Sequence, residues 1–268
     1  MTTKNTDIPV IILCGGLGTR LREETEYKPK PMVEIGGKPI LWHIMKIYSF
    51  YGFTNFILAL GYKGSMIKNY FLNYKYFNND FSINLGTYDT WQYGKNDEDE
   101  RKWKVTLIDT GETTMTGARI KKCAEYINVD NFCVTYGDGV TDAKIIEEYE
   151  FHLAHKKLVT LLGVSPTSRF GELSIEDKLV TNFNEKPVSQ NSRVNGGFFV
   201  INREFLDYLS EDDSCALERQ PLEKAAQNKE VVVFEHNGYW QSMDTYRDYL
   251  YFNDLWKKGD HPWAVWEK

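Results

Sequence analysis

The chain has 268 residues, with 32 basic and 38 acidic side chains, a formal net charge of −6 and 42% hydrophobic residues. This composition is typical of a globular protein, and the acidic balance argues against binding to nucleic acid or a membrane surface, which needs a basic face. No apolar run approaches the ~18 residues of a membrane span, and the four cysteines lack the CxxC spacing that would indicate a metal site.

Short apolar runs alternate with amphipathic stretches along the first half, which predicts an α/β fold with a mostly parallel sheet. The continuously apolar run Pro9–Cys14 has the pattern of a strand covered on both faces. A Gly-rich, charged loop follows, to about Gly37. Further strands are expected at 55–60, 103–108, 132–136 and 158–164, and helices at 39–51, 65–77 and 142–156. The charge run within residues 91–102 predicts a solvated loop.

The order of elements changes near residue 165, where meandering strands replace the regular alternation. Strands are expected within 172–183 and at 196–201 and 231–235, followed by a C-terminal helix over 245–256. No flexible linker separates the two parts. We therefore expect a single domain over residues 1–268, built from two halves at about 8–164 and about 165–268.

The loop after the first strand, residues 14–20 (CGGLGTR), must turn sharply as it leaves a buried strand. Its glycines permit positive φ and let backbone N–H groups approach a phosphate. A dinucleotide-binding fingerprint would need a third glycine where Leu21 stands, and Pro39 after Gly37-Lys38 excludes a Walker loop. The neighbouring Lys28 and Lys30 favour a phosphate-binding loop over a plain turn.

The tract GGLGTRLREETEYKPKPMVEIGGKPILWHI, which begins at Gly15, resembles the signature of the sugar-phosphate nucleotidyltransferases. Within that family, its PKPM and GGKPILWHI portions are similar to the glucose-1-phosphate cytidylyltransferases. Later tracts agree, namely VTLIDTGETTMTGARIKK (105–122), TYGDGVTD (135–142), RFGEL (169–173), NEKP (184–187), NGGFFVIN (195–202) and YWQSMDTYRD (239–248). The resemblance implies a Rossmann-like mixed sheet flanked by helices, with a nucleotide-binding first half and a smaller β-rich, sugar-phosphate-binding second half.

The resemblance also implies a reaction and a set of site residues. The reaction is transfer of a cytidylyl group from CTP to α-D-glucose 1-phosphate, giving CDP-glucose and pyrophosphate for surface polysaccharides such as lipopolysaccharide O-antigen. Arg20, Lys30 and Asp138 are the implied catalytic residues, with both cations on the triphosphate. The implied nucleotide-binding residues are Leu13, Cys14, Gly15, Gly16, Leu17, Gly18, Thr19, Arg20, Lys30, Thr114, Arg119 and Gly137. The implied sugar-phosphate-binding residues are Gly171, Glu185, Lys186, Asn195 and Gly196.

Mg²⁺ is the expected cofactor, with Asp138 and Asp244 as its ligands. Asp138 follows the expected strand 132–136 and so projects at the carboxyl edge of the sheet, where α/β proteins bind ligands. Two carboxylates suffice because Mg²⁺ keeps waters and substrate phosphates as its other ligands. Without the resemblance, Asp244 would be interpreted as the N-cap of the last helix.

Several alternatives stay open at this level: uridylyl or thymidylyl transfer, a different sugar 1-phosphate, or a catalytically silent protein that binds nucleotide sugars and regulates a partner. The presence of all the implied cations and carboxylates disfavours the silent protein. We expect a cytoplasmic homo-oligomer, a trimer or hexamer by resemblance, with no nucleic-acid or membrane partner.

Cys14 stands where the family usually has alanine, which is most simply explained by packing. A second hypothesis is that nearby phosphate-binding N–H groups and cations lower its thiol pKa. Alkylation of Cys14 would then block activity.

Overall fold

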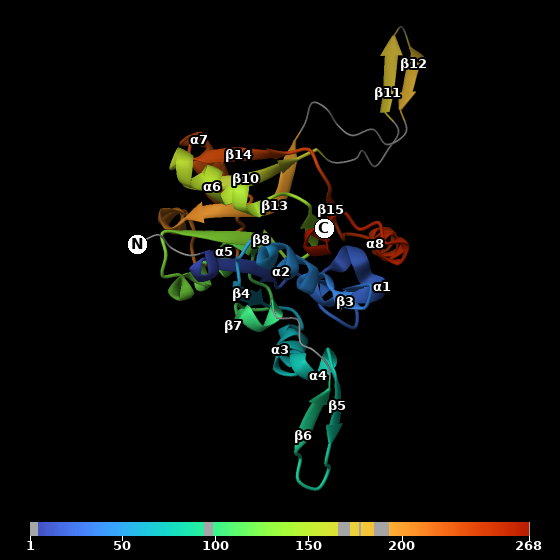
Figure 1. Cartoon of the computed structure of the whole chain (residues 1–268). Coiled ribbons are helices and arrows are strands. Elements are labelled where there is room, and N and C mark those ends of the chain that lie inside the picture. The colour runs from blue at the N-terminus through green and yellow to red at the C-terminus, as the bar shows by residue number, and fades with distance from the viewer. Residues whose placement is uncertain (1–4, 94–98, 166–171, 177, 185–192, 268) are drawn as a thin grey trace.

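The computed structural model describes residues 5–93, 99–165, 172–176, 178–184 and 193–267. Its centre is a seven-stranded sheet with the strand order β14-β10-β13-β8-β1-β4-β7 (Figure 1). These strands are β1 (Pro9–Cys14), β4 (Asn55–Leu60), β7 (Lys104–Asp109), β8 (Asn131–Tyr136), β10 (Val159–Val164), β13 (Val194–Asn202) and β14 (Val231–His236). Strands β8, β1, β4 and β7 run parallel, whereas β13 is antiparallel to both β8 and β10. The predicted fold class, a mixed and mostly parallel sheet flanked by helices, is confirmed.

Strand β1 lies at the middle of the parallel part and is buried on both faces. Successive side chains of a strand point to opposite faces. Accordingly, Val10, Ile12 and Cys14 belong to one core cluster, and Ile11 and Leu13 belong to the other. The continuous apolar run was therefore a sufficient signal, because neither face of this strand meets solvent.

Helices cover both faces of the sheet (Figure 1). Their bounds are α1 (Arg22–Thr25), α2 (Ile40–Phe50), α3 (Gly64–Leu72), α4 (Tyr74–Phe77), α5 (Thr116–Lys122), α6 (Ile145–His155), α7 (Gln220–Gln227) and α8 (Tyr246–Lys258). The prediction of one helix over 65–77 is wrong, because the helix is interrupted at Asn73. The Asn73 side-chain amide donates to the Asn69 carbonyl oxygen, a local bond that competes with continued helix. In the described ranges, no helix is long and apolar enough to cross a bilayer.

Short 3-10 segments lie between these elements, at Asn5–Asp7, Thr19–Leu21, Lys30–Met32, Glu100–Lys102, Ala124–Tyr126, Arg203–Tyr208 and Val265–Glu267. Two-stranded sheets pair β2 (Glu34–Ile35) with β3 (Lys38–Pro39), β5 (Asp80–Ile83) with β6 (Thr90–Tyr93), β9 (Gly139–Thr141) with β15 (Trp240–Ser242), and β11 (Glu172–Glu176) with β12 (Leu179–Asn184). The β5–β6 hairpin extends away from the body of the protein beyond α3 and α4 (Figure 1).

The solvated loop predicted over 91–102 is wrong at its beginning, because residues 91–93 belong to strand β6. Thr90, Trp91 and Tyr93 favour strand structure, and the charge run begins only after them. Residues 94–98 of this segment lie outside the described residues, and Glu100–Lys102 forms a 3-10 turn.

Candidate active site

A cavity of about 390 Å³ lies at the carboxyl ends of β1 and β8. Because these strands are parallel neighbours, the loops that follow them meet at the same edge of the sheet. The predicted nucleotide-binding residues that line the cavity are Leu13, Gly15, Gly16, Arg20, Lys30, Thr114, Arg119 and Gly137, and Asp138 lines it too. The structure thus brings together residues that lie up to 125 positions apart, from Leu13 to Asp138.

Arg119, on α5, is buried and organises the backbone of the cavity wall. Its guanidinium donates to the carbonyl oxygens of Gly15 at 3.0 Å, Leu60 at 2.9 Å and Gly111 at 2.8 Å. A Cβ placed on Gly15 would lie 2.0 Å from the Arg119 Cζ. A glycine is therefore needed at position 15 because the Arg119 guanidinium occupies the space of a side chain. The sequence had predicted a different reason, namely that the loop backbone approaches a phosphate. Among the described residues other than its two chain neighbours, none lies within 4 Å of a Cβ placed on Gly16, so the loop leaves open space there.

The next part of the loop turns away from the cavity. Gly18 has a φ of +62°, and a Cβ there would meet the Thr25 Cγ2 at 2.7 Å. Leu17 and Thr19 line a separate hollow with Thr25. Side chains at 17 and 19 are thus placed away from the cavity, and Gly18 serves as the turn that Gly-rich loops need.

Cys14 is fully buried in the core beneath the loop and does not line the cavity. Burial raises the pKa of its thiol far above the ordinary value, and the nearby Arg119 charge only partly opposes this shift. The hypothesis of a thiolate activated by phosphate-binding groups is therefore wrong. Packing explains the residue, because the desolvation of a charge in the core outweighs the attraction of one cation.

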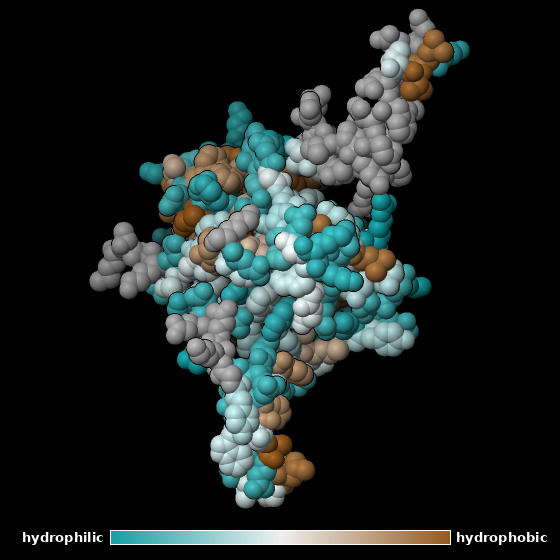
Figure 2. All heavy atoms as spheres, turned by 45° about the vertical axis from the view of Figure 1, so that its right-hand side comes forward, coloured by the Kyte–Doolittle hydropathy of each residue, from teal (hydrophilic) through white to brown (hydrophobic). Residues whose placement is uncertain are grey.

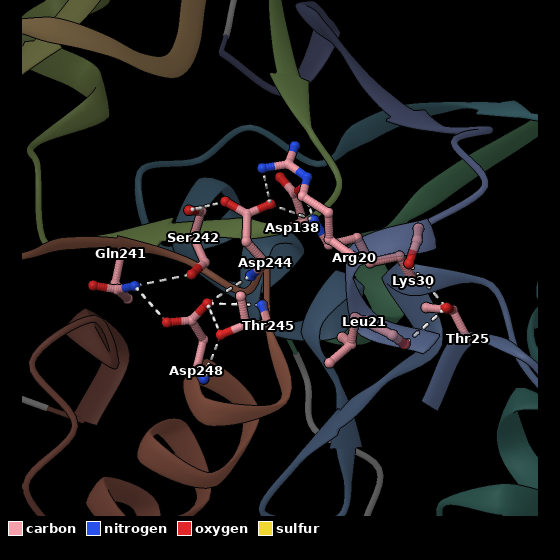
Figure 3. Close-up of polar contacts among 11 residues, drawn as sticks. Arg20, Leu21, Thr25, Lys30, Asp138, Gln241, Ser242, Asp244, Thr245 and Asp248 are labelled. Carbon is pink, nitrogen blue, oxygen red and sulfur yellow. Dashed lines mark hydrogen bonds and ion pairs between the residues drawn. The ribbon is translucent and has the colours of Figure 1, made fainter. Parts of the chain in front are cut away.

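Lys30 links the two carboxylates that were predicted as metal ligands. Its ammonium lies 2.5 Å from the Asp138 Oδ2 and 3.0 Å from the Asp244 Oδ1, and Arg20 Nη1 lies 3.5 Å from the same Asp244 oxygen (Figure 3). Burial alone would lower the pKa of Lys30, but the two carboxylates raise it above its ordinary value. Burial alone would raise the pKa of Asp244, but Lys30, Ser242 and Arg20 lower it. Lys30 and Asp244 therefore stabilise each other's charged form.

The pairing of β9 with β15 places Asp244 beside Asp138, although the two residues are 106 positions apart. Gly139 is opposite Ser242 in this small sheet, and the Met243 N–H donates to the Asp138 carbonyl oxygen at 2.8 Å. The interpretation of Asp244 as a helix N-cap is wrong. Thr245 caps α8 in a capping box with Asp248, which leaves the Asp244 carboxylate directed at the cations (Figure 3).

These residues also fit a magnesium ion chemically. In the described part of the chain, no group of three or more His, Cys, Asp or Glu side chains is placed to hold a metal. Asp138 and Asp244 nevertheless converge on one cation, the Lys30 ammonium. Two carboxylates that stabilise a cation between them suit Mg²⁺, which takes one or two protein ligands and completes its shell with water and substrate phosphates.

Most of the predicted sugar-phosphate-binding set cannot be placed. Gly171, Glu185 and Lys186 lie outside the described residues. Asn195 and Gly196 follow the first residue of β13, which neighbours β8 in the sheet, but neither lines the cavity.

The cavity also contains residues that the motifs did not single out, namely Pro31, Met115, Thr116 and Tyr136. Each lies within two positions of a predicted residue in the sequence. The motifs therefore indicated the segments that carry these four residues. Which side chains of a segment face the cavity depends on backbone geometry that no motif encodes.

The chain is similar in sequence to other proteins over nearly its whole length. A family model described as nucleotidyl transferase matches residues 9–258. The glucose-1-phosphate cytidylyltransferase of Salmonella typhi is 50% identical over 258 residues, which are 96% of this chain and 99% of that protein. A probable glucose-1-phosphate cytidylyltransferase of Bacillus subtilis (strain 168) is 41% identical over 256 residues, with the same shares covered. The crystal structure of HddC from Yersinia pseudotuberculosis, 25% identical, matches with a TM-score of 0.67 over 93% of this chain and 99% of that one.

Proposed function

The chain belongs to the nucleotidyl transferase family, and we propose that it transfers a cytidylyl group from CTP to α-D-glucose 1-phosphate, giving CDP-glucose and pyrophosphate. The observation that carries the choice of CTP and glucose 1-phosphate is the near full-length similarity to two cytidylyltransferases. The cavity supports the reaction class, because it combines cations, a glycine-rich loop and a carboxylate. Nucleotidyl transfer of this kind needs no nucleophilic triad. We further propose a cytoplasmic enzyme that supplies activated sugar for surface polysaccharides such as lipopolysaccharide O-antigen.

In this reaction a phosphate oxygen of glucose 1-phosphate bonds to the α-phosphorus of CTP, and the bond from that phosphorus to pyrophosphate breaks. The attacking phosphate monoester has a second pKa of about 6 and is ionised at neutral pH, so no general base is required. The protein instead has to align the reactants and neutralise charge. Lys30 lies on the cavity wall between two carboxylates, whereas the Arg20 side chain is 73% exposed and contacts Asp244 at its tip.

We also propose that Asp138 and Asp244 hold Mg²⁺ when CTP is bound. The ion would supply positive charge to the phosphate oxygens. Lys30 occupies the position between the carboxylates in this structure, so its ammonium would move from them toward the triphosphate when the metal arrives. Before substrates bind, Lys30 thus offsets the repulsion between two partly buried carboxylates.

The experiment is pyrophosphate release with glucose 1-phosphate and Mg²⁺, with CTP, UTP, dTTP, ATP and GTP in parallel. Release with CTP far above the other nucleotides is expected. An Asp138→Asn variant should lose orders of magnitude in rate, whereas Asp254→Asn, at an exposed position of α8, should keep the wild-type rate. Release with a different nucleotide would contradict the choice of base, and wild-type turnover in Asp138→Asn would contradict the role of that carboxylate.

We propose, in addition, that the chain forms a homo-oligomer, a trimer or hexamer, through its projecting arm. Every residue of β5 and β6 is exposed, and an isolated two-stranded hairpin is marginally stable in water. Figure 2 shows hydrophobic residues on the surface of this arm. Large apolar side chains exposed on or beside it are Leu72, Phe77, Phe81, Ile83, Leu85, Tyr88, Trp91 and Tyr93. Such a surface is typical of a protein interface. Light scattering should give a multiple of 31.2 kDa that falls in Trp91→Asp, and a wild-type monomer would contradict the proposal.

A further inference from the structure

Glu218 precedes α7 and connects two walls of the cavity. Its Oε1 accepts a hydrogen bond from the Tyr136 hydroxyl at 2.6 Å, and its Oε2 accepts one from the Thr116 hydroxyl at 2.7 Å. Thr116 begins α5 and Tyr136 ends β8, and both line the cavity. One carboxylate therefore fixes two lining residues that come from different elements.

The segment that carries Glu218 is bound closely to the start of α5. The Met115 N–H donates to the Asp213 carbonyl oxygen at 2.8 Å, and the Leu217 N–H donates to the Thr116 hydroxyl at 2.9 Å. A Cβ placed on Gly117 would lie 2.8 Å from the Cys215 Sγ, so there is no space between the two segments. The backbone that carries Glu218 is thus fixed against the start of α5.

Tyr136 is held from three sides. Gly197 has a φ of +79°, and a Cβ there would lie 2.4 Å from the Tyr136 Cδ2, so the ring occupies the space beside a glycine. Phe199 contacts the ring edge-on with centroids 5.8 Å apart. Glu218 holds the hydroxyl at the far end. Burial, and then the Glu218 charge, raises the pKa of Tyr136, so the phenol keeps the proton that it donates.

The hydrogen bonds continue to β13. The Tyr136 hydroxyl accepts from the Asn195 Nδ2 at 3.3 Å, and the Asn195 Oδ1 accepts from the Gly197 N–H at 2.8 Å. Because the Tyr136 proton is committed to Glu218, its oxygen is left to accept from Asn195. The Gly197 N–H and the Tyr136 oxygen therefore favour the same orientation of the Asn195 amide, and Glu218 supports it through the Tyr136 proton.

We propose that Glu218 is a positioning residue for the sugar-phosphate end of the site, which acts by orienting Tyr136 and, through it, Asn195. The inference rests on the proposed function, in which β13 lies on the sugar-phosphate side. Its consequence is that recognition of glucose depends on a carboxylate that contacts the site only through other side chains.

The test compares Glu218→Gln, Tyr136→Phe and the double variant with the wild type. The two hydroxyls bond to different oxygens of Glu218, and Gln has an NH₂ group in place of one of them, so one hydroxyl loses its acceptor. We expect the KM for glucose 1-phosphate to rise about tenfold in Glu218→Gln, while kcat and the KM for CTP change less than about twofold. Tenfold corresponds to about 1.4 kcal/mol. The double variant should be no worse than Tyr136→Phe alone, because residues that act through one another are not additive.

Glu223→Gln is the matched control, since it makes the same charge change at an exposed position of α7 and should behave as wild type. Calorimetric binding of CDP-glucose and of CDP gives a readout that does not need turnover. Glu218→Gln should weaken binding of CDP-glucose and leave CDP unchanged. The inference would be overturned if the KM increases of the two single variants multiplied in the double variant, or if Glu218→Gln weakened the binding of CDP as much as that of CDP-glucose. A rise in the KM for CTP would also overturn it. A wild type that binds both ligands but does not turn over CTP would contradict the proposed function only.

Discussion

Glu148 lies on the buried face of α6 and should make the stability of this protein depend on pH. Its side chain is 1% exposed, and within the described ranges its Oε1 has no hydrogen-bond partner. Burial raises its pKa from the ordinary 4.5 to about 8. Burial also raises the pKa of the Cys133 thiol, and the charge of Glu148 raises it further.

Between these two pKa values, the folded chain holds a proton on Glu148 that the unfolded chain has released. The stability contributed by this proton is fully present below pH 4.5 and is lost as the pH rises toward and through 8. Each pKa unit corresponds to about 1.4 kcal/mol. The free energy of unfolding should therefore be lower by about 3 kcal/mol at pH 7 and by about 5 kcal/mol above the folded pKa, as upper limits.

Glu148→Gln removes this titration while it keeps the shape of the side chain. Thermal unfolding followed by circular dichroism is the assay, at pH 5, 7 and 9. Wild type and variant should unfold at similar temperatures at pH 5. At pH 9 the variant should unfold roughly 10 °C higher, since a chain of this size gains about 2 °C per kcal/mol.

The control is Glu150→Gln, the same change at an exposed position of α6. Its unfolding temperature should follow that of the wild type at every pH. A difference between wild type and Glu148→Gln that stays constant from pH 5 to pH 9 would refute the reasoning, because a buried ionisable carboxyl must produce a slope.

Two further predictions concern the loop after β1. Gly15→Ala should destabilise the protein by about 2 kcal/mol or more, because its Cβ would overlap the Arg119 guanidinium, whereas Gly16→Ala should unfold as the wild type does. Equal unfolding temperatures for the two variants would show that the guanidinium moves aside freely. A thiol reagent should label Cys215 first in the native protein, with Cys14 unreactive until unfolding, because Cys14 is fully buried and Cys215 is not. Mass spectrometry of labelled peptides would show this, and early labelling of Cys14 would restore the activated-thiol hypothesis.

The amino-acid sequence was sufficient for the elements whose signals are local. The apolar run Pro9–Cys14 predicted β1, and the glycines after it predicted a turn, because periodicity and turn chemistry act between near neighbours along the chain. The position of Asp138 after β8 followed from the same reasoning about strand ends. Local signals failed where a neighbour competes, as at Asn73, which divides one predicted helix into two.

The contacts that give the site its chemistry were decided by tertiary structure. Lys30 meets Asp138 and Asp244 only because β1 lies beside β8 and β9 pairs with β15. Nothing in the order of the residues states that pairing.

Burial likewise depends on the whole fold. The sequence around Cys14 favoured packing and left a reactive thiol as a second hypothesis, and the depth of β1 in the sheet raises the pKa of the thiol. The motifs predicted a nucleotide-binding role for Arg119 but no role for Glu218. In the structure, Arg119 donates to carbonyl oxygens of the cavity wall, and Glu218 connects two walls of the cavity. Local sequence thus determined most of the strands and helices of the sheet and the turn that follows β1. The tertiary structure decided charge state and side-chain partners, because both depend on which distant segments exclude water from a group and which ones donate to it.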